Sequence, residues 1–204
     1  DTENDNLAIG YAAMITNTAG GQYNTAIGNY ALDALTSGDY NVAVGQGALG
    51  ANNTGSRNTA IGYTALYTNT TGEYNTASGR EALYTNSTGE YNTGIGYQAL
   101  LANTTAGYNT GIGQSALRTN TTGANNTAVG TQALYGNTTA SFNCALGDGA
   151  LYTNSTGANN VAVGRIALYN NTTADNNTAV GYAALTANTT GSENTAVGQN
   201  SLQA

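Results

Sequence analysis

Asn24-Thr25-Ala26-Ile27-Gly28 is the stretch that decides the fold, because closely related stretches return every 17 residues to the end of the chain. The first copy, at Asn6, is one residue out of phase because Gly20-Gly21 lengthens its turn. A fixed period of this length predicts a solenoid, in which each repeat forms one coil and only stacked coils bury a core. We therefore interpret residues 1–204 as a single array whose repeats begin at residues 6, 24, 41, 58, 75, 92, 109, 126, 143, 160, 177 and 194.

Numbered from its Asn, the repeat has the consensus N-T-A-[IV]-G-x-x-A-L-x-x-N-T-T-G-x-x. In an extended strand successive side chains point to opposite faces, so the first, third and fifth positions share one face and the second and fourth share the other. Gly at the fifth position permits a bend, and the Ala-Leu pair that follows predicts a second short strand. The Asn-Thr-Thr-Gly segment then closes the coil as a turn. The sequence therefore predicts an all-β protein, a parallel β-solenoid of about twelve 17-residue coils, each with two short strands and two bends.

The invariant Asn at the first position predicts an internal ladder, since an amide repeated in register can donate to its copy one coil along. Both faces of the first strand are restricted, one to small residues and one to Thr, Ile and Val. A strand with one solvated face would instead alternate restricted and free positions. We infer that the small residues line the coil interior and that the Thr/Ile face packs against other chains in a rotational oligomer, for which we expect a trimer. The alternative is a thicker monomer whose interior takes both Ile and Leu.

Composition excludes several classes of function. The net charge is −7 and the only basic residues are four scattered arginines, which cannot neutralise a nucleic-acid backbone. Lys and His are absent and the carboxylates recur at no fixed position, so we predict no catalytic site, no metal site and no cofactor. The string Gly45–Gly50 matches G-x-G-x-x-G, but no helix is predicted to follow it. No apolar run is long enough to cross a bilayer. The single Cys144 stands at the second position, where we expect a small buried residue.

Two sets of residues are candidate sites. The turn Asn residues form N-x-[ST] sequons, although glycans on successive coils would crowd one edge, which favours an unmodified Asn/Thr ladder. These candidate glycosylation sites are Asn52, Asn69, Asn86, Asn103, Asn120, Asn137, Asn154, Asn171 and Asn188. Tyr recurs at the seventeenth position, at residues 23, 40, 74, 91 and 108, and at the tenth position. We consider two roles for the tyrosines at the tenth position: stacking between neighbouring rings, which stabilises the array, or contact with a receptor. This tenth-position stripe consists of Tyr67, Tyr84, Tyr135, Tyr152 and Tyr169.

The array from Asn6 to Ala204 resembles the head repeats of trimeric autotransporter adhesins, which have the form N-x-A-[IV]-G-x-x-[AS], and the NTAIG-x-x-AL-x-x-NTTG arrays of tail-fibre and surface-fibre proteins. The resemblance implies a left-handed parallel β-roll assembled as a homotrimer. It also implies a stiff extracellular spacer or adhesin on a cell or virion surface, with a glycan or protein receptor as partner. The chain has no initiator Met, so we expect it to be a segment of a longer protein. The alternative function is an ice-binding solenoid that uses stacked Thr and Asn columns.

Overall fold

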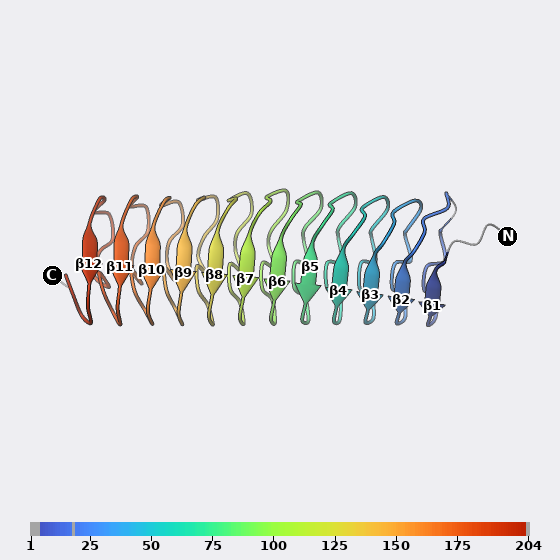
Figure 1. Cartoon of the computed structure of the whole chain (residues 1–204), viewed down its shortest axis with the longest axis horizontal. Helices are drawn as coiled ribbons and strands as arrows, with labels where there is room; N and C mark the ends of the chain where they lie inside the picture. The colour runs from blue at the N-terminus through green and yellow to red at the C-terminus, as the bar shows by residue number, and fades with distance from the viewer. Residues whose placement is uncertain (1–4, 18, 203–204) are drawn as a thin grey trace.

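The computed structural model describes residues 5–17 and 19–202, which form one elongated stack of coils with the first and last strands at opposite ends of the rod (Figure 1). Each coil contributes one strand of three residues, and all the strands belong to a single parallel sheet in sequence order. The strands are β1 (Leu7–Ile9), β2 (Thr25–Ile27), β3 (Val42–Val44), β4 (Thr59–Ile61), β5 (Thr76–Ser78), β6 (Thr93–Ile95), β7 (Thr110–Ile112), β8 (Thr127–Val129), β9 (Cys144–Leu146), β10 (Val161–Val163), β11 (Thr178–Val180) and β12 (Thr195–Val197).

The strands pair in strict register, so each position of the repeat lies beside the same position of the next coil. Ala60 pairs with Ala77, and the neighbouring Thr59 pairs with Thr76. The amide of Thr59 donates to the carbonyl of Asn75 at 2.8 Å, and the same bond recurs from coil to coil. The predicted all-β parallel solenoid with 17-residue coils is confirmed.

The predicted second strand is wrong, because the Ala-Leu pair lies in a turn. Gly96, at the fifth position, has φ of +130°, and the seventh and ninth positions of the same coil, Gln98 and Leu100, have φ of +55° and +54°. A left-handed residue costs roughly 1–2 kcal/mol unless it is glycine. Inter-coil hydrogen bonds offset this cost: Gln98 donates to Arg80 at 3.0 Å, and Leu100 donates to Ala116 at 2.9 Å. The conformation depends on these neighbouring coils, so local sequence propensity does not reveal it.

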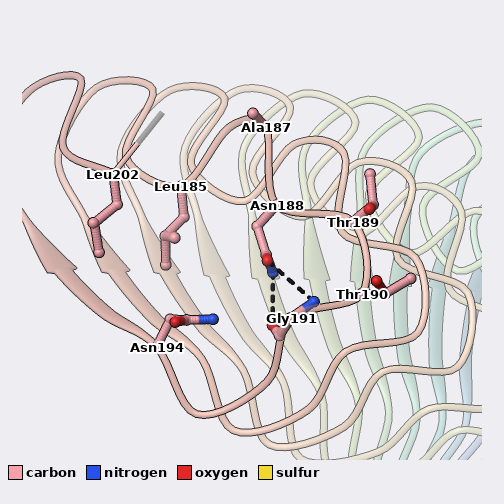
Figure 2. A pocket seen from close by; sticks show the side chains of 8 residues that line it. All are labelled: Leu185, Ala187, Asn188, Thr189, Thr190, Gly191, Asn194 and Leu202. Atoms are coloured by element: carbon pink, nitrogen blue, oxygen red, sulfur yellow. Dashed lines mark hydrogen bonds between the residues drawn. The ribbon is translucent and has the colours of Figure 1, made fainter. Parts of the chain in front are cut away.

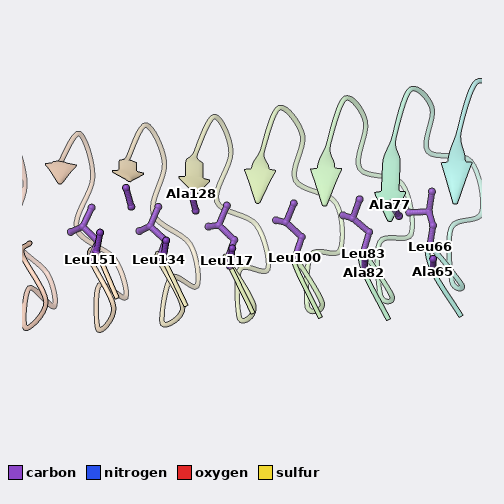
Figure 3. Packing of buried hydrophobic residues seen from close by; sticks show 14 of the residues in the cluster. Ala65, Leu66, Ala77, Ala82, Leu83, Leu100, Leu117, Ala128, Leu134 and Leu151 are labelled. Atoms are coloured by element: carbon purple, nitrogen blue, oxygen red, sulfur yellow. The ribbon is translucent and has the colours of Figure 1, made fainter. Parts of the chain in front are cut away.

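The core is a column of leucines flanked by alanines. Figure 3 shows Leu66, Leu83, Leu100, Leu117 and neighbouring leucines from successive turns, all pointing the same way. These side chains are fully buried, as are the alanines at the centre of each strand from β2 to β5. Leu and Ala therefore fill the apolar part of the coil interior, and the second coil buries an additional leucine, Leu35.

The first-position Asn ladder is confirmed. The Nδ2 of Asn41 donates to Oδ1 of Asn24 at 3.0 Å and to the carbonyl of Gly55 at 2.9 Å. Its own Oδ1 accepts from the backbone amide of Asn58 at 3.0 Å. Both ends of the amide are thus bonded inside the coil, where an unpaired polar group would be costly.

Candidate functional site

The outward side of the sheet forms an uncharged surface that we call the strand face: the second and fourth residues of each repeat. The structure places the central Ala of the strands inside and the second and fourth side chains outside, with Ile61 45% and Leu146 46% exposed. The alternative in which Ile and Leu share one interior is therefore wrong. With twelve in-register strands, the strand face extends for roughly 50 Å at the usual parallel-strand spacing of about 4.8 Å.

Cys144 belongs to the strand face, so the expectation that it is buried is wrong. It replaces Thr at the second position of β9 and is half-buried beside the exposed Leu146. Its Cα lies opposite Thr127 of β8 and Val161 of β10. The chain thus carries its single thiol in the middle of the strand face.

The tenth-position tyrosines form two separate stacks. Tyr67 and Tyr84 lie 5.5 Å apart between ring centroids, with their planes 10° from parallel. The second stack joins Tyr135 to Tyr152 at 5.1 Å and Tyr152 to Tyr169 at 4.9 Å. Between the two stacks lie Leu101 and Arg118, which occupy the same position of the repeat. The ring faces contact one another, so the stripe presents mainly ring edges and hydroxyl groups to a partner.

The tyrosines at the seventeenth position stack in the same way. Tyr74, Tyr91 and Tyr108 lie 4.8 and 5.0 Å apart. Arg57 continues the column, with its guanidinium 5.3 Å from the ring centroid of Tyr74 and 5.5 Å from that of Tyr40. Burial and the neighbouring phenols raise the pKa of Tyr91. Guanidinium and ring stacking stabilises adjacent coils.

The sequon asparagines form a second internal ladder. The Nδ2 of Asn69 donates to Oδ1 of Asn52 at 2.7 Å and to the carbonyl of Gly72 at 2.9 Å. An N-linked glycan attaches at this nitrogen, so a glycan would have to leave the interior and break both bonds. The fully buried members of the ladder are Asn52, Asn69, Asn86, Asn103, Asn120, Asn137, Asn154 and Asn171.

Asn188 is the half-buried member of this ladder, and it lines a pocket of about 320 Å³ at the C-terminal end of the stack. Figure 2 shows its amide bonded to Gly191 of the same coil, with Leu185 and Leu202 nearby. Nδ2 donates to the Gly191 carbonyl at 2.9 Å, and Oδ1 accepts from the Gly191 amide at 3.2 Å. This pocket is the coil interior seen from its end.

A chain of polar contacts crosses the turns that follow β5 to β8. Glu81 accepts hydrogen bonds from Gln98 at 2.6 Å and from Arg80, whose guanidinium also lies 3.0 Å away as an ion pair. The hydrogen bond from Gln98, followed by that from Arg80, lowers the pKa of the Glu81 carboxyl. Arg118 extends the chain by donating to Gln98 at 2.9 Å and to the Tyr135 hydroxyl at 3.2 Å. The repeat pattern does not reveal this network, because its members occupy three different positions of the repeat.

Two pockets open beside glycines at the seventh position. The Gly47 pocket, of about 430 Å³, includes Asp33, Gln46, Thr64 and Tyr67 in its lining. The Gly149 pocket, of about 300 Å³, includes Gln132, Asp148, Ile166 and Tyr169. The repeat consensus does not predict these pockets; the signal for them in the sequence is Gly in place of a residue with a side chain at these two positions.

Within residues 5–17 and 19–202 no three His, Cys, Asp or Glu side chains gather as metal ligands would. The G-x-G-x-x-G string runs from the end of β3 into the turns, and Gly45 and Gly47 have φ of +133° and +66°. None of the described segments is a helix long and apolar enough for a membrane span. Comparison with protein-family models, curated proteins and solved structures found no match to the chain.

Proposed function

We propose that this chain is a segment of an extracellular structural fibre or adhesin: a stiff spacer that assembles as a homotrimer through its strand face. The observation that carries the proposal is the uncharged row of outward Ile, Val and Thr side chains on a continuous parallel sheet. Soluble monomers rarely leave a long apolar strip in contact with water. Burying one Ile or Val stabilises by roughly 1.5–3 kcal/mol, and the strip repeats this gain in coil after coil.

The architecture supports a spacer. The sheet and the first-position Asn ladder join successive coils, and the second Asn ladder joins the coils from Asn52 to Asn188, so bending the rod would strain many bonds together. The turns and tyrosine columns lie outside the strand face and stay available to a receptor when the strand face is covered. We place the protein outside the cell, on a cell or virion surface, as its resemblance to adhesin and fibre repeats implies.

The native mass in solution tests the assembly. The chain has a mass of 20.5 kDa, and we expect light scattering on a sizing column to give three times that value. Ile61→Asp places an unpaired charge on the strand face and should leave a monomer. Thr54→Asp adds the same charge at an exposed turn position and should keep the trimer. A monomeric wild type, or an Ile61→Asp variant that assembles normally, would refute the proposed assembly.

An ice-binding solenoid is the second candidate, and one observation favours it. Thr59, Thr76, Thr93 and Thr110 lie in register on the outward face of a regular sheet, as an ordered array facing water requires. The aliphatic column beside them lacks the second row of hydroxyls that a paired Thr surface would present. A monomer that shows thermal hysteresis would favour ice binding over the fibre.

A further inference from the structure

The Gly47 and Gly149 pockets are two versions of one arrangement. Gly47 follows β3 and Gly149 follows β9, so the pockets lie six coils apart, or roughly 29 Å at the parallel-strand spacing. Each places a seventh-position glycine against the ring of the tenth-position Tyr one coil along, Tyr67 or Tyr169. Both volumes fall in the range of roughly 300–1,000 Å³ that is usual for ligand pockets.

The backbone does not require glycine at these two positions. Gly47 and Gly149 have φ of +66° and +63°, while Thr64, Gln98 and Gln132 occupy the same position of the repeat with φ of +48°, +55° and +56°. Side chains are therefore compatible with this left-handed turn. What the glycines provide is space: a Cβ on Gly47 would lie 3.5 Å from the Tyr67 ring, and one on Gly149 would lie 3.2 Å from the Tyr169 ring.

The pocket walls combine aromatic rings with hydrogen-bonding groups. The Gly47 pocket brings the Asp33 carboxyl and the Gln46 amide beside Tyr67. The Gly149 pocket brings the Asp148 carboxyl and the Gln132 amide beside Tyr169, with Arg165 3.4 Å from Asp148. Burial raises the pKa of the Asp33 carboxyl, so a ligand that donates hydrogen bonds would restore part of its lost solvation.

The Gly47 pocket continues along the stack. A neighbouring pocket of about 460 Å³ shares Tyr63, Thr64 and Tyr84 with it and ends at Leu101. The hydroxyl oxygen of Thr64, which belongs to both linings, is buried without a hydrogen-bond partner among the described residues. Two adjoining pockets suit a ligand of several linked rings better than a single small ring.

We propose that the Gly47 and Gly149 pockets bind a neutral oligosaccharide. A sugar ring has an apolar face that matches a tyrosine and hydroxyl groups that match a carboxylate and an amide. The net charge of −7 and the Asp33 carboxylate of the Gly47 pocket disfavour anionic ligands, and in the Gly149 pocket Arg165 is paired with Asp148. This inference rests on the proposed function, because it names the class of ligand that the proposed adhesin would bind. Two weak sites on one rigid rod would gain avidity for a surface that displays many copies of the sugar.

The test compares filled and open pockets. Gly47→Gln and Gly149→Gln fill the space with the residue that coils six and eight already carry at this position, so both variants should fold. Ser115→Gln is the matched control, because Gln would then lie between Gln98 and Gln132 in a coil without a glycine pocket. The probes are tagged neutral oligosaccharides of glucose, galactose, mannose and N-acetylglucosamine, their sialylated and sulfated counterparts, and an unrelated peptide library.

We expect the wild type to retain a neutral oligosaccharide and titration calorimetry to give two sites per chain. Each single glycine variant should halve the stoichiometry, and the double variant should lower affinity at least tenfold, while Ser115→Gln binds like the wild type. Retention of only anionic glycans or peptides, retention of no probe, or unchanged binding by the double variant would overturn the inference. Light scattering separates this outcome from failure of the fibre proposal, because the double variant leaves the strand face intact and should keep the wild-type mass.

Discussion

At the scale of single residues, the buried Asn side chains fill part of the core, as apolar side chains do in other proteins. Their hydrogen bonds also specify the register between successive coils. Asn75 donates from Nδ2 to Gly89 at 2.8 Å and to Asn58 at 3.2 Å, and its Oδ1 accepts from the backbone of Asn92 at 3.0 Å. A shift of one coil by a single residue would leave all of these groups unpaired.

Asn75→Ala should therefore destabilise the array by about 3 kcal/mol, because each buried group left unpaired costs about 1–3 kcal/mol. Urea denaturation followed by circular dichroism measures the loss. Asn170→Ala is the control, since Asn170 is exposed and makes one side-chain bond to Thr186. We expect the control to change stability by less than about 0.5 kcal/mol, and equal effects of the two substitutions would contradict an interior role for the ladder.

The stability of the array depends on pH through the ionisation of Glu81. Hydrogen bonds from Gln98 and Arg80 lower its pKa below the usual 4.5, so the folded state binds fewer protons here than the unfolded state. The contribution of Glu81 is therefore present above about pH 4.5 and is lost as the pH falls through the folded pKa.

Glu81→Gln should lower the melting temperature relative to the wild type at pH 7, and the difference should shrink at pH 3. Thermal melts at the two pH values measure this. Glu90→Gln, which removes an exposed carboxylate elsewhere in the same coil, is the control for lost surface charge. A deficit of the same size at both pH values would show that the ionised form of Glu81 is not the stabilising one.

At the scale of the element, each coil is a three-residue strand followed by left-handed turns, and the fifth-position glycine joins them. Gly62, Gly79, Gly96 and Gly113 stack directly on one another with φ between +130° and +138°. A Cβ on Gly96 would lie 2.5 Å from the carbonyl oxygen of Gly113, well inside van der Waals contact. Both the dihedral angle and the close approach of the next coil require glycine here.

Gly96→Ala should separate the coils on either side of it and destabilise the array by more than about 4 kcal/mol, as strained and overpacked sites do. Hydrogen exchange should show the loss of protection centred on β6 and β7. Gly149→Ala is the matched control, because its Cβ would meet only side-chain carbons at 3.2–3.4 Å in a turn that other side chains adopt. Its expected cost is within about 1 kcal/mol, and a larger cost than that of Gly96→Ala would refute this account of the fifth position.

At the scale of the whole molecule, one side of the rod is the uncharged strand face, and other parts of its surface carry the tyrosine stacks and the glycine pockets. The strand face is continuous from β1 to β12, whereas the tyrosine stacks and glycine pockets are interrupted and differ from coil to coil. A regular surface suits a repeated contact with identical chains, and an irregular one suits local recognition.

The reactivity of the Cys144 thiol shows whether the strand face is covered by another chain. In the proposed trimer its thiol is covered, so a maleimide should label the wild type at least tenfold more slowly than Ile61→Asp, which lies five coils away and should remain monomeric. Labelling in urea gives the rate for the fully open thiol. Equal rates for the two folded proteins would place Cys144, and with it the centre of the strand face, outside the interface.

The period and the restricted positions of the repeat were sufficient to predict the parallel solenoid, the in-register stacking and the amide ladder. These features follow from sequence because a side chain repeated every 17 residues must lie beside its own copy once the coils stack. The same reasoning correctly separated the inward Ala from the outward Thr and Ile, since strand side chains alternate between faces.

The tertiary structure alone decided the path of the chain after Gly at the fifth position. The Ala-Leu pair is predicted from sequence to be a strand, yet Leu100 adopts a left-handed turn in which the adjacent coil accepts its amide proton and its side chain is buried. The glycine pockets likewise depend on side chains 14 to 20 residues apart meeting across coils. These contacts depend on how each coil is positioned relative to the next. Side-chain packing in the folded structure determines that position.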